Sequence, residues 1–453
     1  MKASATASCR SPFLRIFKGL GSSAAGLLLV GSLAFGCAQS GGGDGNQGMG
    51  GETGGGTGGS PTQTGNGGNT GNPGMGGAGV GGSGSGGSTG TAGMTGTGGS
   101  GAGGRVGTGG MVAGMGGMTG AGGATPVTAY WVATTGSDTN PGTQAAPFAT
   151  LLHANLFAKA GITIWIMPGT YMSTNTVTLG NSGTATNPIN IFAAAGARPV
   201  LDYAPQKAMA PDDNKRGLNI TGDYWHVRGF EIRNANDNGI AISGSHNTIE
   251  DMITDFCGDT GIQITVPSAM ASDPTRGANN LILNCDSHDN YDMATGGENA
   301  DGIDAKLDIG PGNIFRGCRS WNNSDDGYDL FGVTQVVTID NCWAMLNGHL
   351  ADGTKGPAAD GNGFKLGGNH VPAVHVVTNS FSMTNDSCGF TLNNNTAQPK
   401  ITGSGANGNK SSAFCELTNV SGTVTITMTG AQAIAAQRLT NAAANASNLP
   451  AIH

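Results

Sequence analysis

A short motif of glycine, an apolar residue, a variable residue and an apolar residue recurs through the second half of the chain. It begins at glycines that lie 22 to 41 residues apart, namely Gly239, Gly261, Gly302, Gly327, Gly363 and Gly389. In a second register, asparagine follows a cysteine or serine by five residues: Cys285 and Asn290, Cys318 and Asn323, Cys342 and Asn347, Ser380 and Asn385. Repeats of this length are typical of stacked coils. Short β-forming segments without helical periodicity predict an all-β chain folded as a parallel β-helix.

This register also predicts where polar side chains gather. Side chains alternate across a strand, so the two apolar positions of the motif face the core and the variable position faces outward. Asp329 and Lys365 take the outward position on what should be consecutive coils, about 4.8 Å apart. Asp301 and Asp326 directly precede the motif glycine, and Asp325 lies beside Asp326. The sequence therefore predicts one cluster of four aspartates and a lysine.

The N-terminal part has the composition of an export signal followed by a linker. Residues 1–36 carry four basic residues, no acidic residue and an apolar run, as a secretory signal does. The run Leu33-Ala34-Phe35-Gly36-Cys37 resembles a bacterial lipobox, which would make Cys37 the lipidated first residue of the mature protein. An ordinary signal with a chance cysteine is the alternative. Residues 37–125 are rich in glycine and small polar residues, which predicts a disordered tether.

We expect an exported protein that is anchored to the bacterial outer membrane or cell surface through Cys37 alone, or otherwise a secreted one. Residues 126–453 are expected to form the folded domain, with about ten coils over residues 126–430 and a short cap or tail beyond.

The net charge of −8 argues against nucleic acid as a partner. Three of the six cysteines in this domain share one register position, so a column of buried thiols and disulfides both remain open. Zinc is not expected, because no CxxC or HxxxH spacing occurs.

Three segments resemble the pectate lyases of polysaccharide lyase family nine. They are residues 299–307, residues 316–329 and residues 362–368, within a similarity that runs from about Tyr130 to Leu392. The resemblance implies a right-handed parallel β-helix in which four aspartates bind calcium and a lysine is the catalytic base. The matching positions are Asp301, Asp325, Asp326 and Asp329 for calcium and Lys365 for the base. Two positions depart from the family pattern, because Tyr328 replaces the usual tryptophan and Asp304 adds a carboxylate to a normally apolar segment.

These residue types suit β-elimination from a uronate polymer. Removing the proton from C5 places negative charge beside a carboxylate, and a calcium ion bound to that carboxylate would withdraw charge. Calcium takes six to eight oxygen ligands in flexible geometry, which clustered aspartates, water and substrate can supply. The proton must go to an uncharged lysine, whose reference pKa is about 10.4. Partial burial and a nearby divalent cation lower the pKa of Lys365, whereas Asp329 raises it.

Three further basic residues are candidates for binding the carboxylates of an acidic polysaccharide. Lys306 lies near the predicted cluster and suits either this role or a structural one. Arg316 and Arg319 offer forked donors that fit carboxylates, with surface or structural ion pairs as the alternative.

The sequence predicts a monomeric, calcium-dependent pectate lyase that cleaves polygalacturonate. A lyase for another uronate polymer, such as alginate, is the nearest alternative. A hydrolase that uses Asp325 and Asp326 as acid and base is a second alternative. It is disfavoured because adjacent residues of a strand face opposite sides and because Lys365 would have no role. A β-helix that binds polysaccharide or acts as an adhesin without catalysis is the third.

Overall fold

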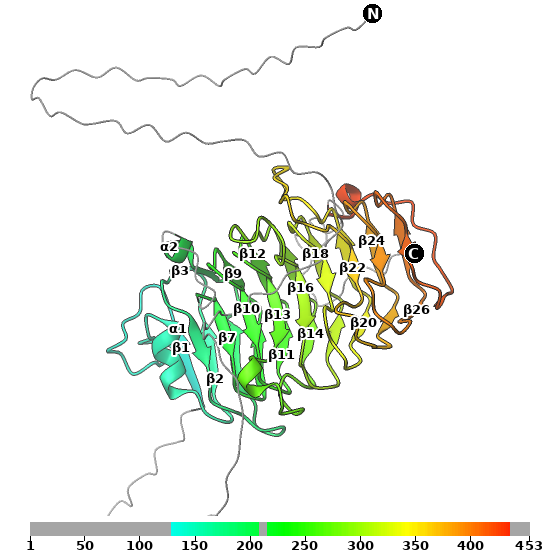
Figure 1. Ribbon diagram of the computed structural model, residues 1–453. Coiled ribbons are helices and arrows are strands. Elements are labelled where there is room, and N and C mark those ends of the chain that lie inside the picture. The colour runs from blue at the N-terminus through cyan, green and yellow to red at the C-terminus, as the bar shows by residue number, and fades with distance from the viewer. Residues whose placement is uncertain (1–127, 208–214, 435–453) are drawn as a thin grey trace, which may run out of the picture. The chain divides into compact units, whose positions relative to one another are not determined.

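The computed structural model describes residues 128–207 and 215–434. The predicted leader, Cys37, the tether and residues 435–453 lie outside the described residues. Within the described ranges the chain winds through three sheets in which every strand pairs with its neighbours in parallel, as Figure 1 shows. Among these residues no helix is both long and apolar enough to cross a membrane.

Sheet A has eleven strands, in the order β1 (Ala129–Val132), β2 (Thr163–Ile166), β5 (Ile189–Ala193), β8 (Trp225–Arg228), β11 (Thr248–Glu250), β14 (Leu281–Leu283), β17 (Ile314–Arg316), β20 (Thr338–Asp340), β23 (Val376–Thr378), β26 (Lys400–Thr402) and β29 (Val420–Ser421). Sheet B has nine strands, in the order β3 (Thr170–Met172), β6 (Val200–Asp202), β9 (Glu231–Arg233), β12 (Ile253–Asp255), β15 (Asp286–His288), β18 (Arg319–Trp321), β21 (Trp343–Met345), β24 (Phe381–Met383) and β27 (Gly405–Asn407). Sheet C also has nine, in the order β4 (Val177–Leu179), β7 (Leu218–Ile220), β10 (Ile240–Ile242), β13 (Ile262–Thr265), β16 (Ile303–Lys306), β19 (Tyr328–Asp329), β22 (Phe364–Lys365), β25 (Phe390–Thr391) and β28 (Phe414–Cys415).

Helices are short and lie outside the sheets. They are α1 (Leu151–Ala154), η1 (Asn155–Phe157), α2 (Ala204–Lys207) and η2 (Ser268–Met270), and residues 430–434 are also helical. The side chain of Thr150 caps α1 by accepting a hydrogen bond from the backbone N–H of His153. A small cluster that contains Trp321, Trp343 and Phe381 of sheet B includes Ile426 and Ala433 from this C-terminal part. These contacts place this C-terminal part against sheet B, whereas most of the predicted cap or tail beyond residue 430 lies outside the described residues.

Each full coil gives one strand to sheet A, then one to sheet B and one to sheet C. The three sheets have eleven, nine and nine strands, which is close to the predicted number of about ten coils. The apolar positions of the repeat fill the space between the sheets, as predicted. Tyr328, Phe364 and Phe390 are fully buried there and stack in sequence, with ring centroids 4.7 and 4.6 Å apart. Tyr328 is therefore part of the core.

The turn from sheet A to sheet B explains the second register. Its residues Asn284, Gly317, Asn341 and Asn379 all adopt positive φ, between 50° and 66°, which asparagine and glycine tolerate best. The next residue on each coil enters the core, and Cys285, Cys318 and Cys342 are fully buried free thiols. The column of thiols is therefore present, and one disulfide joins Cys388 to Cys415 elsewhere in the fold.

The aligned asparagines form a ladder of side-chain amides between sheets B and C. The side-chain amide of Asn290 donates to Asn323 at 2.8 Å, Asn323 to Asn347 at 3.0 Å, and Asn347 to Asn385 at 2.9 Å. The ladder continues to Asn409, which accepts from Asn385 at 2.8 Å. Asn290, Asn323, Asn347 and Asn385 are fully buried, so the ladder satisfies polar groups that would otherwise lack partners in the core.

Replacing Asn347 by alanine should lower the free energy of unfolding by about 2–3 kcal/mol. The change removes the acceptor that Asn347 Oδ1 offers to the backbone N–H and the side-chain amide of Asn323. It also removes the side-chain donor to Asn385 Oδ1, which keeps only the backbone N–H of residue 347 as a donor from this position. Urea unfolding followed by circular dichroism measures the loss, with the exposed Asn175 changed to alanine as the control. An equal effect of the two substitutions would show that the ladder contributes no special stability.

Candidate metal centre and catalytic lysine

Sheet C presents a row of polar side chains on its outer face, as the register predicts. Asp304 on β16 pairs with Asp329 on β19, and Asp329 pairs with Lys365 on β22. Gln263 on β13 precedes Asp304 in the same row. The neighbouring residues of each strand point into the core, because alternation fixes the two faces. The predicted placement of Asp329 and Lys365 on consecutive coils is confirmed.

Asp301, Asp325 and Asp326 meet in the turns that lead from sheet B into sheet C. Each offers a carboxylate oxygen, and the three oxygens lie within 4.8 Å of one another. All three residues are buried. Asp325 and Asp326 precede β19 rather than lying in it, so both reach the same site. The sequence argument that adjacent aspartates must face opposite sides is therefore wrong for this pair.

Backbone N–H groups hold these carboxylates in place. Asp326 N donates to Oδ1 of Asp301 at 3.0 Å, and Asn362 N donates to Oδ1 of Asp326 at 2.6 Å. The two oxygens of Asp325 accept from Asn299 N at 3.0 Å and from Asp360 N at 2.7 Å. The carboxylates are thus positioned by the turns themselves, which is the arrangement that a preorganised ligand set needs.

Two lysines flank the carboxylates, one on each side along sheet C. Lys306 Nζ lies 2.7 Å from Asp301 Oδ2, 3.3 Å from Asp329 Oδ2 and 3.5 Å from Asp304 Oδ2. Lys365 Nζ lies 3.2 Å from Asp326 Oδ2, 3.5 Å from Asp329 Oδ2 and 3.3 Å from Asp360 Oδ2. Asp329 therefore lies between both ammonium groups. The predicted lysine and all four predicted aspartates belong to one constellation.

Burial and crowding shift the ionisation of the constellation. Removal from water, reinforced by the neighbouring carboxylates, raises the pKa of Asp301 and Asp326 well above the usual range, although Lys306 and Lys365 oppose the shift. Burial lowers the pKa of Lys365, but the carboxylates of Asp329 and Asp326 outweigh it and leave that pKa well above the ordinary lysine value. Carboxylates that are costly to ionise together are stabilised by a divalent cation.

The donor set fits a hard divalent cation. Oδ1 of Asp329 is buried and accepts no hydrogen bond from the described residues. Oδ2 of Asp326 is also buried without a hydrogen bond from these residues and faces the ammonium of Lys365. The groups offered are carboxylate oxygens without a nearby cysteine or histidine in the three-residue group, which suits calcium better than zinc. Asp329 is not among the three residues of this group. The two lysines link it to them, because Lys306 contacts both Asp329 and Asp301 and Lys365 contacts both Asp329 and Asp326.

The structure does not bring the two predicted arginines to this constellation. Arg316 lies on β17 of sheet A, where its Nε is 3.1 Å from Asp340 Oδ2. Arg319 lies on β18 of sheet B and is buried, with two hydrogen bonds to the carboxylate of Asp286. Each arginine therefore pairs with an aspartate of its own sheet, away from sheet C. Of the three substrate-binding candidates, only Lys306 lies beside the aspartates of the constellation.

Sequence reasoning missed the residues that complete the site from longer connections. Asp360 and Asn362 come from the connection between β21 and β22, and Asn299 comes from the connection between β15 and β16. These connections contribute to the two longest steps between motif glycines. Because their lengths differ from coil to coil, the repeat does not predict where their residues lie. The closeness of Asp360 and Asn362 to Gly363 in the sequence was the available signal.

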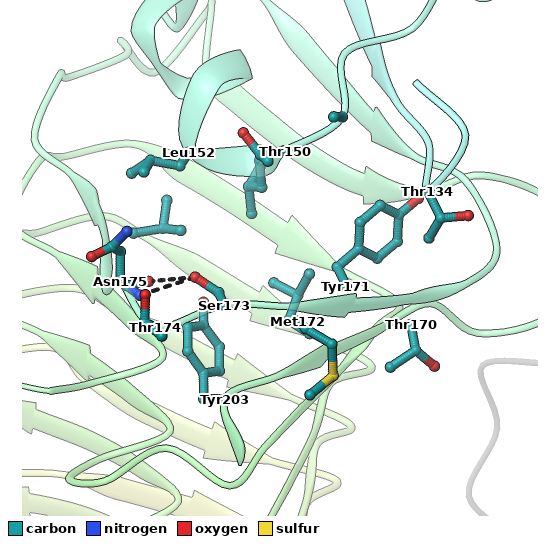
Figure 2. A pocket seen from close by; sticks show the side chains of 14 residues that line it. Thr134, Thr150, Leu152, Thr170, Tyr171, Met172, Ser173, Thr174, Asn175 and Tyr203 are labelled. Atoms are coloured by element: carbon teal, nitrogen blue, oxygen red, sulfur yellow. Dashed lines mark hydrogen bonds between the residues drawn. The ribbon is translucent and has the colours of Figure 1, made fainter. Parts of the chain in front are cut away.

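A separate cavity lies at the N-terminal end of the β-helix (Figure 2). Its volume is about 350 Å³, and hydroxyl-bearing residues such as Thr134, Thr150 and Ser173 line it together with Leu152 and Tyr171. None of the predicted site residues is among those that line it. The cavity therefore has no part in the constellation on sheet C.

Comparison with known proteins agrees with this geometry. A pectate lyase L of Paenibacillus polymyxa (strain SC2) is 42% identical over 263 residues, which make up 56% of this chain and 58% of that protein. A pectate lyase L of Dickeya chrysanthemi is 38% identical over 276 residues, or 59% of this chain and 62% of that protein. The chain thus spans about three fifths of the length of these relatives.

Solved structures give the same result for the fold. The crystal structure of pectate lyase Pel9A superposes with a TM-score of 0.56 at 34% identity, covering 66% of this chain and 78% of that one. A rhamnogalacturonan lyase superposes with a TM-score of 0.52 at 31% identity, covering 61% and 73%. The model of the Pel9A-like right-handed β-helix region matches residues 130–423. Because that match covers well over half of the sequence, the chain belongs to the Pel9A-like right-handed β-helix family.

Proposed function

We propose that the protein is a calcium-dependent pectate lyase that cleaves polygalacturonate by β-elimination. The observation that carries the proposal is the placement of Lys365 Nζ 3.2 Å from Asp326 in a constellation of buried carboxylates. The relatives that share this region are pectate lyases, which supports the same chemistry here. Bound at Asp301, Asp325, Asp326 and Asp329, calcium would supply the positive charge that attracts the uronate carboxylate and stabilises charge on C5.

The protein's own residues would orient the substrate and move the proton. Lys365 is the base in this proposal, because the family resemblance gives this position that role and its amine lies 3.2 Å from Asp326 Oδ2. Asp360 lies beside it, with Oδ2 3.3 Å from Lys365 Nζ and a side chain that is 55% exposed, so this part of the constellation is open to solvent. The uncharged amine of Lys365 would take the C5 proton, and the C5–H electron pair would form the double bond between C4 and C5. The C4–O bond would break with its electron pair on the glycosidic oxygen, which would take a proton from water.

A direct assay tests the proposal. Purified protein incubated with polygalacturonate and calcium should generate ultraviolet absorbance from the new carbon–carbon double bond, and excess chelator should abolish the increase. Reducing ends without this absorbance would instead indicate the hydrolase that uses Asp325 and Asp326. Binding of the polymer without either product would indicate a non-catalytic β-helix or adhesin.

A different uronate-containing polymer is the second candidate substrate. The structural similarity to a rhamnogalacturonan lyase favours testing that class of backbone, and alginate tests the alternative raised by the sequence. Comparing initial rates on the three polymers identifies the substrate, because each lyase reaction yields the same type of unsaturated product. If the rate on rhamnogalacturonan or alginate exceeds the rate on polygalacturonate, that polymer is the substrate instead.

We also propose that the protein acts outside the cytoplasm as a monomer, attached through a lipid on Cys37 or else secreted. The composition of residues 1–36 and the lipobox-like run before Cys37 support this location. Metabolic labelling with a fatty-acid probe, with Cys37→Ala as the control, tests the attachment. Label that persists in the variant would contradict it.

A further inference from the structure

Asp304 is a buried carboxylate on the strand before the constellation, and it has partners of its own. Thr260 Oγ1 donates to Asp304 Oδ2 at 2.7 Å, and Gln263 Nε2 donates to the same oxygen at 3.1 Å. The residue is fully buried. These bonds fix the side chain in the row on sheet C, one coil before Asp329. Asp304 is therefore a rigidly held carboxyl group beside the predicted metal ligands. Burial raises its pKa to about 7, although the charge of Lys306 opposes the shift, so the group is mainly a negative charge above that pH.

Lys306 lies two residues along the same strand, so it shares the outer face with Asp304. Its ammonium contacts Asp304, Asp301 and Asp329 at the distances given above, and its side chain is 14% exposed. Three carboxylates thus surround one ammonium group. Only Asp301 and Asp329 belong to the predicted metal ligands, whereas Asp304 is held by Thr260 and Gln263.

We propose that Lys306 is a built-in counter-charge for the carboxylate constellation, that Asp304 offsets part of its charge from 3.5 Å away, and that this pair sets how tightly the constellation binds calcium. The inference rests on the proposed function, because it takes calcium as the ion bound. Lys306 is a positioning residue in this scheme, since it acts through Asp301 and Asp329 and need not touch the substrate.

The two members of the pair act on calcium affinity in opposite directions. The ammonium of Lys306 competes with a cation for the same oxygens and repels it, so its presence weakens binding. Asp304 draws part of that positive charge away from Asp301 and Asp329 and adds a negative charge nearby, so its presence strengthens binding. A purely structural pair would behave differently, because loss of either partner would disturb the ligands and weaken binding.

Calcium titration by isothermal calorimetry, in the absence of any polysaccharide, separates these cases. The variants are Lys306→Met, which removes the charge and keeps the chain length, and Asp304→Asn, which keeps the shape and an oxygen for Thr260. Lys306→Met should bind calcium at least about tenfold more tightly than the wild type, and Asp304→Asn about three- to tenfold more weakly. The double variant restores the net charge and should fall within about threefold of the wild type. Lys400→Met, which removes an exposed lysine on sheet A, should leave the affinity unchanged.

Weaker or unchanged calcium binding by a folded Lys306→Met variant would overturn the proposal, and unchanged binding would return Lys306 to a role in substrate contact. If that variant does not fold, Lys306→Gln, which also removes the charge, takes its place with the same expected gain in affinity, and weaker or unchanged binding by it overturns the proposal. Equal or tighter binding by Asp304→Asn also contradicts the scheme. Wild-type protein that binds no calcium would instead refute the proposed metal centre. The order of calcium affinities among the variants tests the role of Lys306 and Asp304, and the wild-type titration tests the calcium site of the proposed function.

Discussion

Replacing Lys365 by alanine should lower the rate of unsaturated-product formation by about 10²- to 10⁴-fold, the usual effect of removing a general base. Lys365 Nζ contacts Asp326, Asp329 and Asp360. The other ammonium of the site, on Lys306, is bound among Asp301, Asp304 and Asp329. The fold should survive the change, because β22 is anchored by Phe364 in the core and by pairing with β19 and β25.

The pH dependence of the wild type gives a second test of this role. The surrounding carboxylates raise the pKa of Lys365 well above its ordinary value despite burial. The uncharged amine is therefore the minor form near neutral pH, and its fraction grows as the pH rises toward that pKa. The rate at saturating calcium should accordingly increase with pH through the neutral and mildly alkaline range. A rate that falls over this range would contradict an amine base.

The control for this experiment is Lys400→Ala, which removes an exposed lysine from sheet A. It should keep the wild-type rate and pH profile. Circular dichroism and calcium titration confirm that the Lys365→Ala variant remains folded and able to bind the ion. Near-normal product formation by that variant would transfer the role of base to another residue, and Lys306 would be the first to examine.

The outward row on sheet C could be predicted because it depends only on local rules. Each coil gives one strand to the sheet, strand residues alternate between two faces, and glycine marks where the strand begins. These rules suffice to place Asp329 next to Lys365 and to bury Tyr328. The asparagine ladder follows in the same way, since a residue at one register position meets its equivalent on the next coil.

The turns and long connections could not be predicted by the same rules. Asp325 and Asp326 meet because they lie in a turn, where alternation does not apply. Asp360 reaches Lys365 from a connection whose length differs from that of other coils, so no equivalent position indicates its path. Arg319 follows Cys318 directly, and the cysteine register places it on sheet B rather than beside the aspartates. Its pairing with Asp286 depends on two coils whose outward residues have complementary charge.

Replacing Asp326 by alanine should abolish measurable calcium binding and reduce the rate of product formation to near the background. Asp326 is fully buried, its Oδ1 accepts from the backbone N–H and the side-chain amide of Asn362, and its Oδ2 accepts no hydrogen bond. It therefore offers a fixed carboxylate oxygen, 3.2 Å from the ammonium of Lys365, at the point where Asp301 and Asp325 converge. Loss of one of a few charged ligands removes both an oxygen and a negative charge from the site.

A second substitution separates the loss of charge from damage to the turn. Asp326→Asn keeps an oxygen that can accept from Asn362 but carries no charge, so it should remain folded and still bind calcium far more weakly than the wild type. Asp308→Ala, which removes an exposed aspartate beyond β16, should leave calcium affinity and rate unchanged. Calcium titration and the ultraviolet assay on the same preparations provide both measurements. If Asp326→Asn retained wild-type calcium affinity, the carboxylates of these turns would be structural and the ion would have to bind elsewhere.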